Sequence, residues 1–304
     1  MGEPTANSAD ATLLLVRECV AYMRHDYRSE RRMRKIRHVL VAIALISGIV
    51  FTWQRIWLSG ALDLQCAFSS DAACQPLAIV TLQGSLQDGS PSTADAIIAS
   101  LERASRRTKD IVLYIDSPGG SGVQAQRIGD KLVQLRNQGV RVTVVAGSTL
   151  ASAAYLVATH ADRIVVPKYA LVGSVGAVQQ GWDISGLLEK LDIKPRTIAS
   201  GPLKAAMSPF EPQDEASRRY TQQLIEAVGR QFVADVQRLR GSRLKLEREQ
   251  IASGAVWDGA AAVAAGLADE NGTLESVLAA SGRRAQNFGG SVQRSGLLSV
   301  LFSH

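Results

Sequence analysis

The chain has few of the residues on which several common kinds of protein site depend. Its 304 residues include 3 cysteines and 4 histidines. These are too few for a disulfide scaffold or a zinc-finger array, and no HExxH or similar metal-ligand spacing occurs. Aromatic residues make up only 5% of the chain and charged residues 20%, whereas 46% of the residues are hydrophobic. This composition excludes a disordered, collagenous or coiled-coil protein and permits a large core rich in alanine, valine and leucine.

The basic charge is concentrated near the N-terminus. The formal net charge is +6, and residues 1–37 hold 8 Lys and Arg against 5 Asp and Glu. Residues 38–304 hold 26 Lys and Arg against 23 Asp and Glu, so the same surplus of three positive charges is spread over a much longer stretch. A nucleic-acid-binding protein normally carries its basic charge on the folded part. We therefore expect no nucleic-acid partner.

A long apolar segment follows the basic region. Residues 39–58 contain one charged side chain, Arg55, and approach the ~20 apolar residues that a helix needs to cross a bilayer. Residues 24–37, just before them, contain 7 Lys and Arg, and the positive-inside rule keeps such a flank in the cytoplasm. The sequence predicts an uncleaved single-pass signal anchor at 39–58, with a cytoplasmic arm at 1–38 and the remainder outside.

A cleavable signal peptide is the main alternative to this anchor. Ser59, Gly60 and Ala61 have the small side chains of a cleavage site. The long basic region before the apolar segment and Arg55 near its end favour the anchor instead. A buried core helix is disfavoured beside so basic a flank.

Three regions outside the central domain carry weaker patterns. Apolar residues recur at helical spacing within residues 10–34, which predicts an amphipathic helix on the membrane surface or against a partner. Cys66 and Cys74, in a predicted linker at 59–75, lie on the oxidising side as either a disulfide or two free thiols. Residues 282–304 are rich in Gly, Ser and Arg and are expected to form a loose tail.

Residues 76–281 alternate between strand and helix patterns and form the predicted folded domain. Buried strands are expected at 76–82, 110–115, 140–146 and 163–166. Helices are expected at 92–107, 121–138, 151–161, 214–240, 245–252, 259–266 and 274–280. This order indicates the α/β class, with a mainly parallel sheet and a helical C-terminal part.

Three stretches of small residues are candidates for chemistry. Asp116–Ser121 follows a strand, and its paired glycines can expose backbone N–H groups to an oxyanion, although a plain tight turn has the same pattern. Ser152 lies near the start of a predicted helix, where free N–H groups stabilise negative charge, although serines there are usually caps. Gly173–Ala177 alone indicates only a glycine turn.

A serine nucleophile needs a base, and the histidines are badly placed to supply it. His25 and His38 lie on the cytoplasmic side of the predicted anchor, and His304 ends the chain. His160 is eight residues beyond Ser152 on the same predicted helix, or about 12 Å along its axis. A Ser-His-Asp triad is therefore disfavoured, which leaves a Ser-Lys pair with a lysine kept neutral by burial.

Several blocks, in order, resemble one family. These are DSPGGSGVQAQRI, STLASAAYLVATHADRIVV, LVGSVGAV, LLEKLDIKPRTIASGPLKAAMSPFEP and VWDGAAAVAAGLADENGTLESV. Together they resemble the signal peptide peptidase (protease IV-like) family of membrane serine peptidases, in its short single-copy form. The likeness runs from about Leu77 to Ala280. It implies a crotonase-like, Clp-protease-like spiral of strand–helix units.

The resemblance implies a role for six residues. Ser152 matches the nucleophile and Lys204 the general base, while Ser174 matches a serine that orients the lysine. The oxyanion donors would be the N–H groups of Gly119 or Gly120 and of Ala153. The family likeness further implies peptide substrates such as spent signal peptides, a ring-shaped homo-oligomer, no cofactor, and a place in the bacterial cytoplasmic (inner) membrane with the peptidase domain outside.

The sequence also departs from the family pattern. Ala153-Ala154 replaces the usual Gly-Gly after the nucleophile, Ala205 replaces an acidic residue after the lysine, and Asp116 replaces an asparagine. The alanine pair favours one alternative, a non-catalytic membrane scaffold that binds peptides on the same fold. A crotonase-type acyl-CoA enzyme is a second alternative, and it would need neither the Ser-Lys pair nor a membrane.

Overall fold

The computed structural model describes residues 76–90 and 92–290, together with residues 14, 16–18, 20, 21, 41, 43–51 and 53 nearer the N-terminus. The chain divides into two compact units after Ser69. The described residues of the first unit are helical. None of the helices formed by described residues is both long and apolar enough to cross a membrane. The predicted linker, the Cys66–Cys74 pair and residues 291–304 lie outside the described residues.

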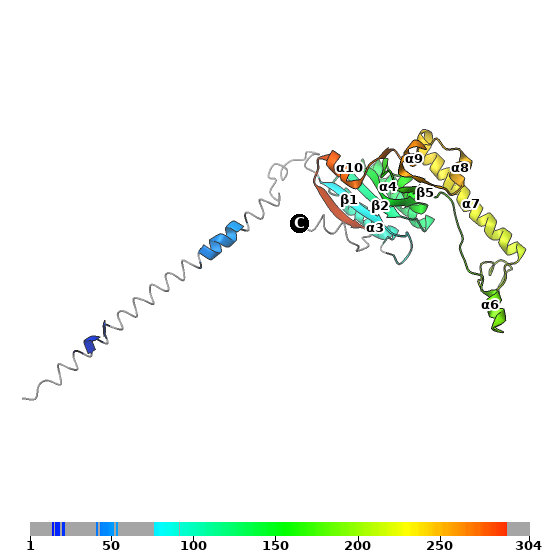
Figure 1. Cartoon of the computed structure of the whole chain (residues 1–304), viewed down its shortest axis with the longest axis horizontal. Helices are drawn as coiled ribbons and strands as arrows, with labels where there is room; N and C mark the ends of the chain where they lie inside the picture. The colour runs from blue at the N-terminus through cyan, green and yellow to red at the C-terminus, as the bar shows by residue number, and fades with distance from the viewer. Residues whose placement is uncertain are drawn as a thin grey trace, which may run out of the picture. The chain divides into compact units, whose positions relative to one another are not determined.

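The second unit is built on an eight-stranded sheet, shown in Figure 1. Its central strands are β1 (Leu77–Gln83), β2 (Asp110–Ser117) and β3 (Arg141–Ala151), which pair in parallel. β8 (Ala285–Gly290) pairs with β1 at one end of the sheet. The prediction of an α/β domain with a mainly parallel sheet is therefore confirmed.

β3 is longer than the predicted strand and pairs with two strands in succession. Its first part lies beside β4 (Arg163–Val166), and its last three residues lie beside β5 (Leu171–Gly173). β5 pairs in turn with the short antiparallel strand β6 (Val256–Asp258), and β4 pairs with β7 (Glu270–Asn271). The predicted strand at 140–146 omits this second part, because residues 147–151 have small side chains and no strand pattern of their own.

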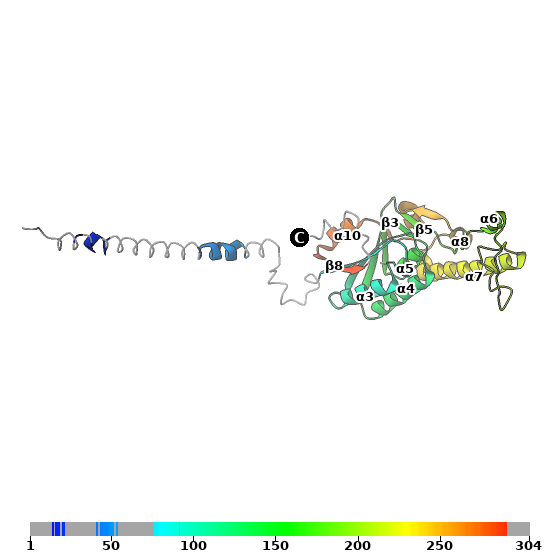
Figure 2. The same cartoon turned by 90° about the horizontal axis from the view of Figure 1, so that it is seen from below.

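Helices cover both faces of the sheet. α3 (Ala94–Ser105), α4 (Gly122–Asn137) and α5 (Ala153–Thr159) lie on one face, and α10 (Leu274–Ser281) lies on the other (Figure 2). Alternate strand residues therefore enter two cores. Ala78, Val80, Leu82, Ile111 and Leu113 belong to the larger core, and Leu77, Ile79, Val112 and Leu274 to the smaller one. Because both faces of the sheet are buried at β1, nearly all residues of this strand are apolar.

The rest of the domain contains a long helix and several short ones. α7 (Glu215–Arg240) packs against α5 and is followed by a 3-10 turn, η2 (Gly241–Arg243), and by α8 (Arg248–Ala252) and α9 (Gly259–Ala264). Only α6 (Ser185–Lys190) interrupts the irregular segment between β5 and α7. The sequence predicts a loose tail from residue 282, and this prediction is wrong for residues 285–290, which form β8. The segment has no strand pattern of its own, and it forms a strand because it pairs with β1, which is distant in the sequence.

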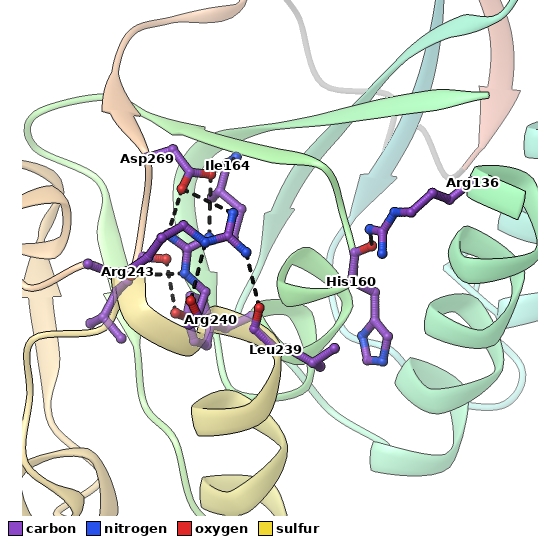
Figure 3. A network of polar contacts seen from close by, with 10 residues as sticks. Arg136, His160, Ile164, Leu239, Arg240, Arg243 and Asp269 are labelled. Carbon is purple, nitrogen blue, oxygen red and sulfur yellow. Dashed lines mark hydrogen bonds and ion pairs between the residues drawn. The ribbon is translucent and has the colours of Figure 1, made fainter. Parts of the chain in front are cut away.

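A buried ion pair joins the C-terminal end of α7 to the sheet (Figure 3). Arg240, only 2% exposed, donates from Nη2 to Asp269 Oδ1 at 2.7 Å and from Nε to the Gly266 carbonyl at 2.8 Å. Asp269 Oδ2 accepts the Ile164 N–H of β4 at 2.7 Å. Burial by itself would raise the pKa of Asp269, but the hydrogen bonds from Arg240 and from the Ile164 N–H hold it below its usual value.

This buried pair predicts a large and specific stability loss. Arg240→Ala leaves the half-buried Asp269 carboxylate with only the longer ion pair to Arg243, at 3.6 Å, and removes a side chain that is itself fully buried, so the free energy of unfolding is expected to fall by about 3 kcal/mol. Arg238→Ala removes an exposed arginine that pairs with Asp235 at 2.8 Å and should cost less than about 1 kcal/mol. Urea unfolding of both full-length variants, followed by circular dichroism, measures the two losses. Equal losses would contradict this account of the pair.

Candidate active site

Ser152 lies between β3 and α5 in a backbone conformation that is unusual for a residue with a side chain. Its φ is +51° and its ψ is −127°. The Ser152 N–H donates to the Gly173 carbonyl at 2.7 Å, and its carbonyl accepts the Leu156 N–H at 3.0 Å. Although Ser152 occupies the N-cap position of α5, its side chain makes no cap hydrogen bond. The backbone cost is of the kind found at functional sites, and the hydroxyl is left available for chemistry.

The glycine turn after β2 lies against Ser152. A Cβ placed on Gly119 would lie 2.7 Å from Ser152 Cβ and 2.9 Å from the Ala153 nitrogen. Gly119 has a φ of +105°, which also favours glycine. The absence of a side chain at Gly119 is therefore what allows the turn to approach Ser152 and the first N–H of α5.

The hydrogen bonds of this turn distinguish its two glycines. The Gly119 N–H donates to Ser117 Oγ at 3.1 Å, so it is already used. Leu86 donates to the Gly119 carbonyl at 2.8 Å and accepts the Ser121 N–H at 2.6 Å, a parallel bridge in which the Gly120 N–H points away from Leu86. Within the described part of the chain, neither the Gly120 N–H nor the Ala153 N–H has a hydrogen-bond partner. This arrangement favours Gly120 over Gly119 as the oxyanion donor beside Ala153.

One buried polar side chain that was not predicted from the sequence lies in α4, the helix that follows this turn. Gln124, a buried residue of α4, accepts the Ala94 N–H at 2.6 Å and donates to Asp88 Oδ1 at 2.5 Å. It thereby joins the first residue of α3 to Asp88 in the loop that precedes this helix. The signal in the sequence was a glutamine on the apolar face of the helix, four residues before Ile128.

Asp116 supports the last part of β3. The pairing of β2 with β3 is interrupted between Ile115 and Ser117, so that three residues of β3 lie opposite Asp116. Asp116 Oδ1 accepts the Thr149 N–H of this bulge at 3.0 Å. The carboxylate that replaces the family's asparagine therefore has a structural partner.

Ser174 follows β5 as Ser152 follows β3. Ala151 and Gly173 are paired residues of these two strands, so the two serines leave neighbouring strands at the same level. Ser174 also has a positive φ, +53°, and its N–H donates to the Ala255 carbonyl at 2.8 Å. Both serines are half-buried, and no hydrogen bond to either hydroxyl is formed by described residues. The structure thus brings together Ser152, Ser174, Gly120 and Ala153.

Lys204 is placed differently. It lies in the irregular segment between β5 and α7, its side chain is exposed, and its Nζ forms no hydrogen bond or ion pair with the described residues. Figure 1 shows α6, from the same segment, beside the N-terminal end of α7 and away from the sheet. Among the neighbours of Lys204 along the chain, Ala206 is buried but Met207 is 43% exposed. One chain therefore does not form the buried lysine pocket that the sequence analysis expected.

His160 lies at the far end of the nucleophile's helix. Ser152 precedes α5 and His160 follows it. The ring Nδ1 lies 2.9 Å from the Leu156 carbonyl oxygen and the ring packs against Gly129 of α4. Burial lowers the pKa of His160, and Arg136 donates to its carbonyl oxygen (Figure 3). A role for His160 as the base is excluded by this position. No cluster of three potential metal ligands occurs among the described residues.

Two family models match the chain. The model of peptidase family S49 matches residues 134–286, and the Clp protease model matches residues 73–193. The first match covers half of the chain. The chain belongs to peptidase family S49. Ser152, Ser174 and Lys204 lie inside this match, and the glycine turn lies inside the Clp protease match.

Curated proteins with protease names are similar to this S49 family member. A protein of Methanocaldococcus jannaschii whose name calls it a protease is 34% identical over 170 residues, or 56% of this chain and 54% of that protein. A signal peptide peptidase SppA of Enterococcus faecium is 30% identical over 57% of this chain and 50% of its own. A SohB protease of Haemophilus influenzae is 28% identical over 60% of this chain and 50% of its own length. The chain spans about half the length of these relatives.

The glycine turn yields a prediction with a matched control. Gly119→Ala should lower kcat/KM of this S49 family member by about a hundredfold or more, because its methyl group would displace Ser152 or the Ala153 N–H. Gly122→Ala, three residues later, meets nothing within 4 Å and should retain near-normal activity. A peptide-hydrolysis assay measures both. An active Gly119→Ala enzyme would show that the turn does not contribute to the site.

His160 yields the opposite expectation. Because it lies at the far end of α5 from Ser152, His160→Ala should leave peptide turnover within a few-fold of the wild type. The same peptide assay applies, with thermal unfolding as a check that the variant is folded. A loss of three orders of magnitude in a folded variant would revive a histidine-based mechanism.

Proposed function

We propose that this S49 family member is a serine endopeptidase in which Ser152 is the nucleophile and Lys204 of a neighbouring copy is the general base. The observation that carries the proposal is the position of Ser152. It has a positive φ and a free hydroxyl, and it lies beside two N–H groups, of Gly120 and Ala153, that no described residue uses. Such N–H pairs stabilise the oxyanion of acyl transfer.

The reaction follows from these groups. The neutral amine of Lys204 takes the proton of Ser152 Oγ, and the oxygen attacks the scissile carbonyl carbon. The N–H groups of Gly120 and Ala153 hold the resulting oxyanion. The protonated lysine then gives its proton to the leaving amine, which leaves an acyl-enzyme. Water attacks this ester with the lysine again as base, and the carboxylic acid and free Ser152 are released. No step requires a cofactor.

The need for a second copy comes from the position of the lysine. An ammonium cannot accept a proton, so the amine must be removed from water to act as a base. In one chain Lys204 is exposed. A neighbouring copy can supply both the serine that Lys204 must meet and the surface that excludes water. Ser174, which leaves β5 beside Ser152, is then placed to orient the amine.

Exposed apolar side chains support assembly with further copies. Trp182 is 85% exposed and Ile198 is fully exposed in the segment that carries Lys204. Tyr220, Leu224 and Val228 form a partly exposed stripe along α7. Apolar surface of this extent is typical of a protein–protein interface. We propose a ring-shaped homo-oligomer in which each copy's Lys204 segment meets the next copy.

The cellular setting remains that predicted from the sequence. We propose that residues 39–58 anchor the chain in the bacterial cytoplasmic membrane, with residues 1–38 in the cytoplasm and the peptidase domain outside. The described residues of this segment are helical, and Ile43, Leu45, Ile46, Ile49 and Phe51 present apolar side chains to the surroundings. Apolar peptides, such as cleaved signal peptides and other membrane-derived segments, are the proposed substrates.

A non-catalytic scaffold is the second candidate. The exposed position of Lys204 and the Ala153-Ala154 pair after Ser152 favour it. The two candidates differ in one reaction, because only a peptidase forms a covalent bond from Ser152 to a fluorophosphonate probe. Labelling of the full-length protein that is lost in Ser152→Ala supports the peptidase. A wild-type protein that stays unlabelled supports the scaffold.

A mixing experiment tests the lysine and its origin together. Ser152→Ala and Lys204→Arg should each lose turnover by at least about a thousandfold, since a guanidinium remains protonated. If the base comes from the next copy, assemblies formed from equal amounts of both variants contain about one intact site in four, by random pairing around a closed ring. Turnover of an apolar peptide should then recover to about a quarter of the wild-type value.

The controls separate the possible outcomes. Lys194→Arg alters an exposed lysine in the same segment and should remain active. An active Lys204→Arg variant would show that another group is the base. Inactive single variants whose co-assembled mixture stays inactive would show that serine and lysine act within one chain.

A further inference from the structure

The N-terminal ends of the parallel strands form the edge of the sheet that lies opposite the proposed active site, which is at their carboxyl ends. Ser152 and Gly119 follow the carboxyl ends of β3 and β2. Arg141 begins β3, which spans 11 residues. At about 3.3 Å per residue, roughly 30 Å therefore separate the first residue of β3 from the nucleophile. The opposite edge is formed by the connections that lead into the strands.

Five of these connections carry the whole net charge of the domain. They are residues 106–110, 138–141, 160–163, 265–270 and 282–285, which lead into β2, β3, β4, β7 and β8. They contain seven Lys and Arg against four Asp and Glu, whereas the remainder of residues 76–290 contains seventeen of each. We call these five connections, with the first residue of each strand, the basic edge.

Ion pairs leave part of this charge unmatched. Asp110 is shared by Arg141, at 2.8 Å, and Arg283, at 2.7 Å, so one carboxylate faces two guanidinium groups. Four further cations of the basic edge are exposed and form no ion pair with described residues. They are Arg106, Arg107, Lys109 and Arg284.

A hollow lies at the same edge, where the chain enters the domain. A cavity of about 490 Å³ is lined by Leu77, the first residue of β1, and by Arg141, Arg163 and Arg283. Arg283 Nη2 also donates to the Pro76 carbonyl at 3.2 Å. Pro76 and Leu77, where the described part of the domain begins, therefore lie among these arginines.

We propose that the basic edge binds the phosphate headgroups of anionic phospholipids in the bilayer that holds the chain. The inference rests on the membrane anchor of the proposed function but not on its catalytic chemistry. The linker at 59–75 has 17 residues and spans at most about 60 Å, so the edge cannot move farther than that from the proposed anchor. Each basic residue near an anionic surface adds a weak attraction, and tethering makes weak attractions sufficient.

This docking has a consequence for the substrate. With the basic edge on the lipid, the carboxyl ends of β2 and β3 face away from the bilayer. Ser152 then lies roughly 30 Å from the lipid surface. The enzyme would cleave peptides that have left the membrane, not segments still inserted in it.

The test uses the full chain with Ser152→Ala, so that catalysis does not enter. The protein is reconstituted in nanodiscs of phosphatidylcholine alone or with about one third phosphatidylglycerol. Amide hydrogen exchange is followed in the peptides that cover residues 106–110 and 282–285. We expect exchange at least threefold slower in the anionic discs at low salt, and a loss of this difference at about 0.5 M salt, where charges are screened within a few ångströms.

Two charge variants show whether the effect belongs to this edge. Changing Arg106, Arg107, Lys109 and Arg284 together to glutamine should abolish the dependence on lipid. Changing Lys168, Arg218, Lys245 and Arg248, four exposed cations elsewhere on the domain, removes the same charge and should preserve it. Equal exchange in both lipids, or equal effects of the two variants, would overturn the proposal.

Two further measurements complete the test. Inorganic phosphate added to the phosphatidylcholine discs should not slow exchange, and protection by phosphate alone would overturn lipid docking in favour of a simple anion site. Co-elution of the chain with the discs reports the anchor separately. If the chain does not enter discs, flotation with anionic and neutral vesicles decides: binding to anionic vesicles only supports the basic edge, and binding to neither overturns it.

Discussion

The candidate site depends on the way β3 divides its pairing between two strands. Its first part lies beside β4 and its last three residues lie beside β5, so β3 runs on past the end of β4. The Ala151–Gly173 pair places Ser152 and Ser174 on neighbouring strands at the same level. The bulge opposite Asp116 makes this extension possible, and the Asp116 carboxylate satisfies the Thr149 N–H that the bulge leaves unpaired. Without this extension the two serines would lie on strands that do not touch.

The proposed oxyanion donors, the N–H groups of Gly120 and Ala153, depend on a second close approach, between the glycine turn and the start of α5. Gly119 supplies the space, since any side chain there would meet Ser152, and Gly120 supplies the free N–H. Leu86 holds the turn from the outside, and the buried Ser117 hydroxyl accepts the Gly119 N–H. The site is therefore positioned mainly by backbone hydrogen bonds from separate segments of the chain. A rigid frame of this kind suits a serine that must be held in an unfavourable backbone conformation.

The proposed active site and the surplus of basic residues lie at opposite ends of the strands. The carboxyl ends of the strands carry the small residues and the strained serines, whereas the opposite edge carries the surplus of Lys and Arg. The long helix α7 connects a third region to this frame, because Arg240 and Asp269 fix its C-terminal end while its N-terminal end adjoins the segment that carries Lys204. A base delivered from such a segment joins peptide hydrolysis to assembly, and free single copies would then be inactive.

The sequence by itself determined the α/β class, the central strands and their helices, and the positions of Ser152, the glycine turn and Ser174, because these follow from local patterns and short motifs. It also disfavoured His160 as the base, because the rise of the helix over eight residues separates it from Ser152. Only the tertiary structure decided between Gly119 and Gly120, revealed that Gln124 joins α3 to Asp88, and turned residues 285–290 into β8. It also placed Lys204 in an exposed segment. These features depend on contacts between residues far apart in the chain, such as Leu86 with Gly120 and β1 with β8, and no local pattern records such contacts.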